Sequence, residues 1–396
     1  MQEFMSWNFD ETVNREGTWC VKYDLRKEIF GEADIIPMWV ADMDFNTPPF
    51  IVSAIKERAG HEVYGYSFRP QVYYSSIADW LSKQYKWQIS TDWICFSPGI
   101  VPALNFCTLA FTEPGDGIIV QPPVYFPFFS AIESHGRKLL YNRLVNTGKR
   151  WEMDVRSLHQ PQFENAKAIF ISNPHNPVGR SWSKEELTEL CEFCLKRNIL
   201  IISDEIHSDL TLPGYMHTPV ATLGEEIAEI TITLTAPSKT FNIAGLATSS
   251  VIISNPLLIK RFLTLTESLH VGNGNIFGIT ASIAAYTSGY EWLQDLIRYI
   301  DKNVSFAIDF INKNIPGISA VKPEATYMLW LDCTGLQMGV KELQSLFIKN
   351  ARVGLNEGST FGPGGEGFMR MNVATSMTNV EQALEQIAKA VSDLKK

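Results

Sequence analysis

The sequence has little of what marks several large classes of protein. Six cysteines in 396 residues are too few and too scattered for a disulfide framework, so we expect reduced thiols and a cytoplasmic protein. Acidic residues outnumber basic ones by 43 to 34, and the formal charge of −9 argues against nucleic-acid binding. No apolar run approaches the roughly 18 residues of a membrane-spanning helix. We therefore expect a small-molecule partner, with no nucleic acid and no membrane.

One cysteine pair, Cys191 and Cys194, has the spacing of a metal or redox site. It lies within "SKEELTELCEFCLKR", a helical pattern in which positions i and i+3 share one face, and no second ligand pair accompanies it. Ser183 and Glu186 form a capping-box pattern at the start of this helix. We interpret the two cysteines as helix positions and predict no metal site.

Between about residues 90 and 255, short runs rich in Ile and Val alternate with helical patterns. Such runs are typical of parallel strands that are buried on both faces. The alternation predicts an α/β fold with ligand chemistry at the carboxyl ends of the strands. The runs are "WICFS", "DGIIVQ", "KLLYNRL", "AKAIFIS", "NILIISDE", "EITITLT" and "TSSVIIS".

The last third of the chain has a mixed pattern of helices and strands. Strands are expected near "ATYMLWLD" and "GFMRMNVA", and the last helix follows a second capping-box pattern, Thr378 to Glu381. The length of the chain favours two domains. We assign a large domain to residues 46–285 and a smaller α+β domain to residues 1–45 and 286–396. The helices are expected at 256–271, 276–287, 291–314, 340–350 and 379–394.

Polar side chains gather where the predicted strands end. "WICFS" runs into Gly99, whose following helix could hold an anion on its free N–H groups. "AIFIS" runs into "NPHNPVG", "NILIIS" into Asp204, and "ITITLT" into Lys239. Taken singly, each has an ordinary interpretation: a lysine after a strand is commonly a solvated loop residue, and an aspartate there a helix cap. Their convergence on one edge of one sheet favours an active site.

In this order and context, these segments resemble the fold-type I pyridoxal-phosphate enzymes of the class I/II aminotransferase superfamily. The resemblance spans nearly the whole chain. It is strongest to the carbon–sulfur β-lyases of the MalY/PatB type, often called cystathionine β-lyases. It implies a large domain with a mostly parallel seven-stranded sheet, a smaller α+β domain, and pyridoxal 5'-phosphate as cofactor. The segments that carry it are "IIPMWVADMDF", "YGY", "PGIVPAL", "QPPVYFPF", "NPHNPVGR", "SDEIHSDL", "TAPSKTFNIAGL" and "GEGFMRMNVA".

The resemblance also implies which residues bind the cofactor. Lys239 would bond covalently to its aldehyde and, once displaced by the substrate, remove the Cα proton. Asp204 would keep the pyridine nitrogen protonated, Asn176 would bind the phenolate oxygen, and His207 would assist beside it. Many aminotransferases have a tyrosine where this chain has His207.

Other residues would hold the ring and the phosphate. Tyr125 is expected to stack on the ring, although a core aromatic is the alternative. Ser238, Tyr64 and the N–H groups of Gly99, Ile100 and Val101 would bind the phosphate. In this superfamily the residue at the position of Tyr64, to which we also give a catalytic role, comes from the neighbouring subunit. A homodimer with shared active sites is therefore implied.

The substrate site follows from the resemblance as well. Arg370 would clamp the substrate carboxylate with a bidentate fork, and Trp39, Val40 and Asn173 would line the same pocket. Two positions depart from the aminotransferase pattern: Ala247 replaces a phosphate-binding arginine, and Ala236 replaces a hydroxyl residue. The phosphate would therefore depend more on backbone donors.

The expected reaction is β-elimination from L-cystathionine or another S-substituted L-cysteine, which yields a thiol, pyruvate and ammonia. Transamination between an L-amino acid and a 2-oxo acid is the nearest alternative, because both reactions begin with loss of the same proton. A nicotinamide dehydrogenase is disfavoured, since no G-x-G-x-x-G follows an early strand, and "GPGGEG" lacks that context. A non-catalytic binding protein is disfavoured because both Lys239 and Asp204 are present.

Overall fold

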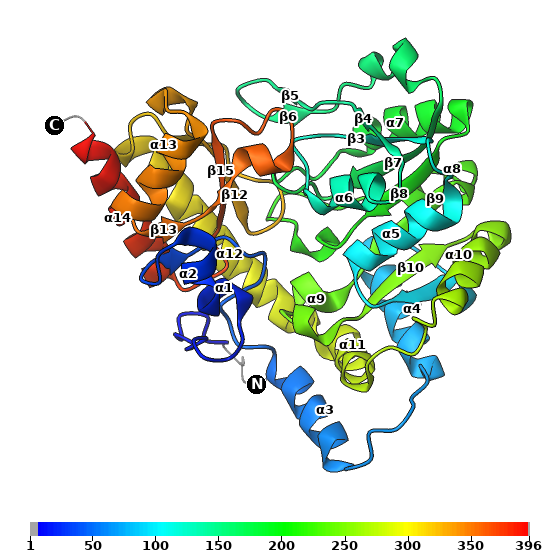
Figure 1. Ribbon diagram of the computed structural model, residues 1–396. Helices are drawn as coiled ribbons and strands as arrows, with labels where there is room; N and C mark the ends of the chain where they lie inside the picture. Colours follow the sequence, from blue (N-terminus) through cyan, green and yellow to red (C-terminus); the bar gives the residue numbers. More distant parts are fainter. Residues whose placement is uncertain (1–6, 395–396) are drawn as a thin grey trace.

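A seven-stranded sheet forms the centre of the larger part of the protein in the computed structural model, which describes residues 7–394 (Figure 1). The strand order is β2-β10-β9-β8-β7-β3-β4. Within this sheet β10 alone runs opposite to the other six strands, so the predicted mostly parallel sheet is confirmed. The strands are β2 (Ile94–Ser97), β3 (Gly117–Val120), β4 (Lys138–Tyr141), β7 (Ala166–Ser172), β8 (Leu200–Asp204), β9 (Thr231–Thr235) and β10 (Ser249–Ile253).

Helices cover both faces of this sheet, and every residue of β2, β3, β9 and β10 is buried. Successive residues of β7 belong to opposite layers: Phe170 packs with α5, α6 and α10, whereas Ile169 and Ile171 pack with α7. Cys191 and Cys194 lie buried on α7, as the helix-face interpretation predicts. The helices are α5 (Ile100–Phe111), α6 (Pro127–Glu133), α7 (Lys184–Arg197), α8 (Glu225–Glu229), α9 (Pro237–Thr240) and α10 (Pro256–Ser268).

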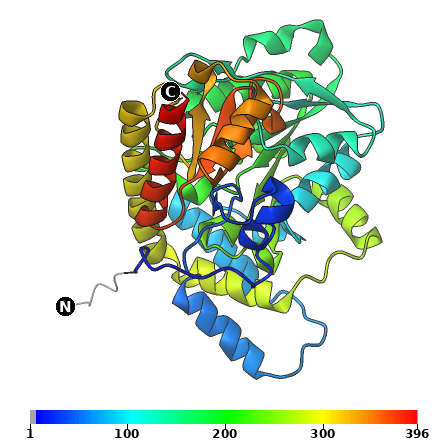
Figure 2. The same ribbon diagram turned by 60° about the vertical axis from the view of Figure 1, so that its left-hand side comes forward.

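A second, antiparallel sheet of order β11-β12-β15-β14 lies beside the first (Figure 1). The long helices α12 and α14 lie side by side against it, as both views show (Figures 1 and 2). A short hairpin, β5 with β6, adds to the edge of the larger part. The elements are β5 (Val145–Asn146), β6 (Trp151–Glu152), α12 (Tyr290–Asn314), β11 (Ser319–Ala320), β12 (Met328–Asp332), α13 (Val340–Ser345) with a π-helical turn at Leu346–Asn350, β14 (Asn356–Glu357), β15 (Phe368–Asn372) and α14 (Met377–Asp393).

The N-terminal segment joins the second sheet region before the chain enters the larger part. Its strand β1 pairs in parallel with β13. Helix α3 then packs against α11 and lies at the lower edge of the molecule (Figure 1). Within residues 7–394 no helix combines the length and apolarity needed to cross a bilayer. The elements are α1 (Val21–Asp24), α2 (Arg26–Phe30), β1 (Ile36–Pro37), α3 (Pro49–Gly60), α4 (Gln71–Tyr85), α11 (Ile276–Ser288) and β13 (Val353–Gly354).

One of the two predicted capping boxes is correct and the other is wrong. In α7 the Ser183 hydroxyl accepts from the N–H of Glu186, whose carboxylate accepts from the N–H of Ser183. In α14 the N-cap is Ser376, whose hydroxyl accepts from the N–H of Asn379 at 3.4 Å, and Thr378 already lies inside the helix. The helix therefore begins two residues earlier than the pattern indicated.

Candidate active site

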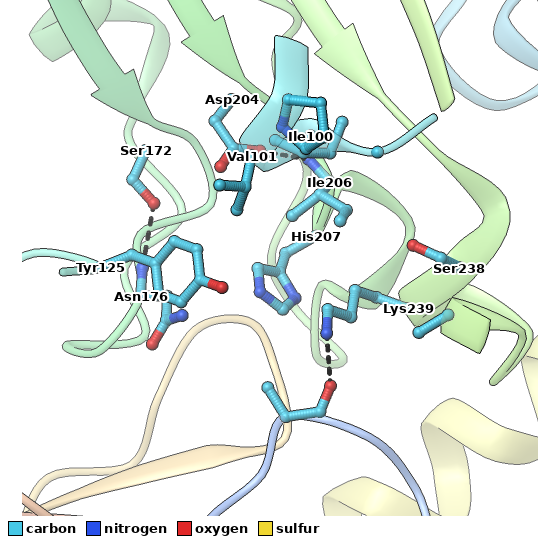
Figure 3. Close-up of a pocket in the computed structure, with 14 residues that line it drawn as sticks. Ile100, Val101, Tyr125, Ser172, Asn176, Asp204, Ile206, His207, Ser238 and Lys239 are labelled. Carbon is cyan, nitrogen blue, oxygen red and sulfur yellow. Dashed lines mark hydrogen bonds between the residues drawn. The ribbon is translucent and has the colours of Figure 1, made fainter. Parts of the chain in front are cut away.

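A cavity of about 200 Å³ lies at the carboxyl ends of the central strands. Register places Ser172 at the end of β7 opposite Asp204 at the end of β8, and Asp204 opposite Leu234 of β9. Side chains from the segments that follow these strands surround the cavity (Figure 3). Of the residues predicted from the sequence, those that line it are Gly99, Ile100, Val101, Tyr125, Asn176, Asp204, His207, Ser238 and Lys239.

Lys239 extends into the cavity from α9, the short helix that follows β9. Its Nζ donates to the backbone carbonyl of Ala41 at 2.5 Å, across the cavity wall (Figure 3). Burial lowers the pKa of Lys239 to about 8, although the nearby carboxylate of Asp42 acts in the opposite direction. About a tenth of this amine is therefore neutral at pH 7, far more than for a lysine in water, and the neutral form is what a nucleophile or base requires.

Asp204 ends β8 and lines the same cavity. Burial raises the pKa of this carboxyl to about 7, and the N–H of Ile206 partly offsets the rise by donating to Oδ1 at 3.1 Å. A buried carboxylate at neutral pH is stabilised by a cationic partner. The cavity thus has an amine on one wall and, on another, an acid suited to a protonated ring nitrogen.

Neutral polar and aromatic groups complete the cavity wall. Burial lowers the pKa of His207 to about 3, so its ring is uncharged, and its Nδ1 has no hydrogen-bond partner among the described residues. Burial also raises the pKa of Tyr125, which stays a neutral phenol. The N–H of Tyr125 donates to the carbonyl of Asn176 at 3.0 Å, which joins the two segments.

Arg370 approaches the cavity from β15 of the second sheet. Its Nη1 donates to Asn176 Oδ1 at 3.0 Å, and its Nη2 donates to Asn356 Oδ1 at 2.7 Å and to the carbonyl of Trp39 at 2.9 Å. Its Nε has no partner among the described residues. Burial lowers the pKa of Arg370 to about 10, which leaves the guanidinium charged near pH 7. An unused donor on a buried cation suits a carboxylate ligand.

The remaining predicted residues lie outside the cavity lining. Trp39 and Val40 precede Ala41, which does line it, and their carbonyls are bound by Arg370 and Asn372. Asn173 is buried, and its amide donates to the carbonyl of Thr218 at 3.0 Å.

Tyr64 lies apart from the cavity within a single chain. It is 57% exposed, its hydroxyl donates to the carbonyl of Ala59, and its ring contacts Phe277. It lines a different, open pocket together with Asn273. A role for Tyr64 beside Lys239 therefore requires another copy of the chain.

Sequence reasoning missed two residues that bind this region. Tyr327 donates to the carbonyl of Ala41 at 3.1 Å, and Asn372 donates to the carbonyls of Val40 and Asp42 at 2.7 and 2.6 Å. Both lie within or beside strands that read as buried. The available signal was a tyrosine and an asparagine in otherwise apolar runs, because buried polar groups require partners.

Comparison with known proteins places the chain in a family. The family model "Aminotransferase class I and II" matches residues 33–387. The chain belongs to this family. Cystathionine beta-lyase PatB of Bacillus subtilis is 43% identical over 97% of this chain and 100% of its own length. A cystathionine beta-lyase of Corynebacterium glutamicum is 31% identical over 90% of this chain and 93% of its own.

Solved structures agree on the fold. A putative aminotransferase from Clostridium difficile 630 with bound pyridoxal phosphate matches at TM-score 0.96 and 39% identity, over 97% of this chain and 100% of that one. Cystalysin from Treponema denticola, which contains a pyridoxal 5'-phosphate cofactor, matches at 0.95 and 37%, over 98% and 100%. A C-S lyase from Staphylococcus hominis matches at 0.89 and 33%, over 97% and 98%. The predicted fold class is therefore confirmed.

Proposed function

We propose that this chain is a pyridoxal-phosphate-dependent carbon–sulfur β-lyase that cleaves L-cystathionine or another S-substituted L-cysteine. The observation that carries the proposal is the pairing of Lys239 and Asp204 on the walls of one cavity. Full-length similarity to proteins named cystathionine beta-lyase and C-S lyase supports the choice of reaction.

The residues present fit the cofactor. The cavity is surrounded by the amine of Lys239, the carboxyl of Asp204, the ring of His207 and the ring of Tyr125. Among the described residues, Asp204 forms no ion pair and Nδ1 of His207 has no hydrogen-bond partner. The first N–H groups of α5, at Ile100 and Val101, provide donors for a phosphate. Ser238 adds a hydroxyl at the same wall, whereas Ala236 and Ala247 contribute none.

When bound, pyridoxal phosphate supplies a conjugated ring that accepts the electron pair released at the substrate Cα. Lys239 takes the proton from Cα, and Asp204 keeps the ring nitrogen protonated. Arg370 orients the substrate through its carboxylate, which the free Nε and the neighbouring Nη atoms can bind.

Bond breaking at Cβ follows the loss of the Cα proton. The C–S bond breaks with both electrons on sulfur, and the proton held by Lys239 is available to the departing thiolate. Addition of water to the remaining three-carbon fragment then yields pyruvate and ammonia. The burial that holds Lys239 partly neutral is what permits one amine to serve as base and then as acid.

Transamination is the second candidate, favoured by the family name and by the relative described as a putative aminotransferase. Incubation of the purified protein with L-cystathionine, with no 2-oxo acid added, separates the two reactions. We expect stoichiometric pyruvate and homocysteine. A strict requirement for an added 2-oxo acid would instead identify a transaminase.

We further propose a homodimer with shared active sites, and the cytoplasm as its compartment. The exposed position of Tyr64 supports the first proposal, because a single chain leaves it outside the Lys239 cavity. Six free cysteines, five of them buried, support a reducing compartment.

A further inference from the structure

Four consecutive backbone carbonyls of the N-terminal segment are bound by side chains from the second sheet region. Arg370 binds the carbonyl of residue 39, Asn372 binds those of residues 40 and 42, and Tyr327 binds that of residue 41. All four acceptors belong to the segment Trp39–Asp42. These bonds fix the orientation of each peptide group in that segment.

The carbonyl of Ala41 is distinctive because two side chains donate to the same oxygen. Lys239 Nζ lies 2.5 Å from it and the Tyr327 hydroxyl 3.1 Å from it. Tyr327 is fully buried, and burial raises the pKa of its phenol well above the usual range, so the hydroxyl keeps its proton and donates. The ring of His207 packs edge-on against it, with centroids 6.2 Å apart.

We propose that Tyr327 is a positioning residue that holds the Ala41 carbonyl as the resting place of the free Lys239 amine. This inference rests on the proposed function, in which the substrate displaces Lys239 and the freed amine then removes the Cα proton. The oxygen keeps the amine on the cavity wall. By donating to the same oxygen, Tyr327 makes it a weaker acceptor for the charged ammonium and so favours the neutral, reactive form.

Three other charged side chains face Lys239, and of these the carboxyl of Asp204, with a pKa of about 7, gains its charge as the pH rises through neutrality. The carboxylates of Asp42 and Asp204 favour the ammonium and the guanidinium of Arg370 disfavours it, while His207 is neutral. Asp42 is held by a 2.6 Å ion pair with Arg15. Removing the Tyr327 hydroxyl changes none of these charges, so its effect on the amine can be measured alone.

The test uses the full-length protein freed of cofactor and then mixed with pyridoxal phosphate at a series of pH values. The neutral amine bonds to the aldehyde carbon and one water leaves, so the rate of cofactor capture, followed by absorbance, reports the neutral fraction of Lys239. For Tyr327→Phe we expect the midpoint of the rate profile to rise by roughly 0.3 to 0.5 pH unit, a fraction of the value of one hydrogen bond, because the bond from Lys239 to the Ala41 carbonyl remains and is only strengthened.

Two further variants keep the test decisive. Tyr299→Phe removes a hydroxyl that binds Asp10 and the N–H of Met377, away from the cavity, and is expected to leave the midpoint unchanged. Incorporation of 3-fluorotyrosine at position 327 keeps the ring and strengthens the donor, so the midpoint should fall even if the phenylalanine variant does not fold.

An unchanged midpoint in the position-327 variants, or shifts of the opposite sign, would overturn the role of Tyr327. Cofactor capture does not require lyase activity. A protein that shows these shifts but releases no pyruvate from L-cystathionine would refute the proposed reaction and leave the positioning role intact.

Discussion

Burial moves the two central ionisable side chains of the site toward their neutral forms. The pKa of Lys239 falls to about 8 and that of Asp204 rises to about 7. Each shift is a free-energy cost of placing a charge in the cavity when no cofactor is bound. The sequence could predict the identity of both residues, because each follows a strand in a family-like motif. It could not predict Tyr327, whose part depends on a carbonyl nearly 290 positions away in the chain.

We predict that Lys239→Met stabilises the cofactor-free protein. The folded-state pKa of Lys239 is depressed from 10.5 to about 8, so the folded state binds its proton more weakly than the unfolded state does. The cost is full below pH 8, declines between pH 8 and 10.5, and vanishes above. Methionine keeps the apolar stem without the charge, so urea unfolding at pH 7 should show a gain of about 3 kcal/mol.

A surface lysine provides the control for that measurement. Lys260 is exposed on α10, and Lys260→Met should change the free energy of unfolding by less than about 0.5 kcal/mol. Equal gains in both variants, or a gain in Lys239→Met that persists above pH 10.5, would contradict the buried-charge explanation.

We predict that Arg370→Lys weakens substrate binding more than cofactor binding. Lysine keeps the positive charge but lacks the planar fork, and it cannot bind Asn176, Asn356 and a substrate carboxylate together. In steady-state assays, kcat/KM should fall by about 10- to 100-fold, mainly through a higher KM. The absorbance of the bound cofactor should be retained. Loss of that absorbance would place Arg370 at the cofactor instead.

At the level of elements, local sequence patterns predicted strand and helix identity better than helix ends. All seven predicted strands of the central sheet form, and in the interior strands the runs of Ile and Val are buried on both faces, whereas the edge strand β4 is partly exposed. The start of α14 was misread because Ser376 and Thr378 are both of residue types that cap helices, and only Thr378 is followed by a glutamate three residues later. The choice between them depends on the path by which β15 delivers the chain to the helix.

A pair of alanine variants tests whether Ser376 is the N-cap of α14. Ser376→Ala removes the hydroxyl that accepts from Asn379 and should lower the free energy of unfolding by about 1 kcal/mol. Thr378→Ala changes an exposed residue in the first turn and should be nearly neutral. Chemical denaturation of both variants measures the difference. A larger loss of stability in Thr378→Ala than in Ser376→Ala would instead identify Thr378 as the cap.

At the scale of the whole molecule, similarity to known motifs predicted the fold class and the convergence of strand ends on one cavity. The division at residues 46 and 285 stays a prediction. So do the roles of individual residues. The contacts between the N-terminal segment and the second sheet could not be predicted from the sequence. Arg370 and Asn372 bind backbone carbonyls of that segment, and every residue type has a backbone carbonyl.

The position of Tyr64 leads to a prediction about assembly. Tyr64→Ala and Lys239→Ala should each be inactive as pure proteins. A mixed dimer contains one chain of each variant. If the active sites are shared between chains, one site of this dimer contains both substituted residues and the other site contains neither. Unfolding the two variants together and refolding them should therefore restore about a quarter of wild-type pyruvate release, since half of the randomly formed dimers are mixed. Purified mixed dimers without activity would show that Tyr64 acts within its own chain, in which its ring contacts Phe277 and it lines a pocket separate from that of Lys239.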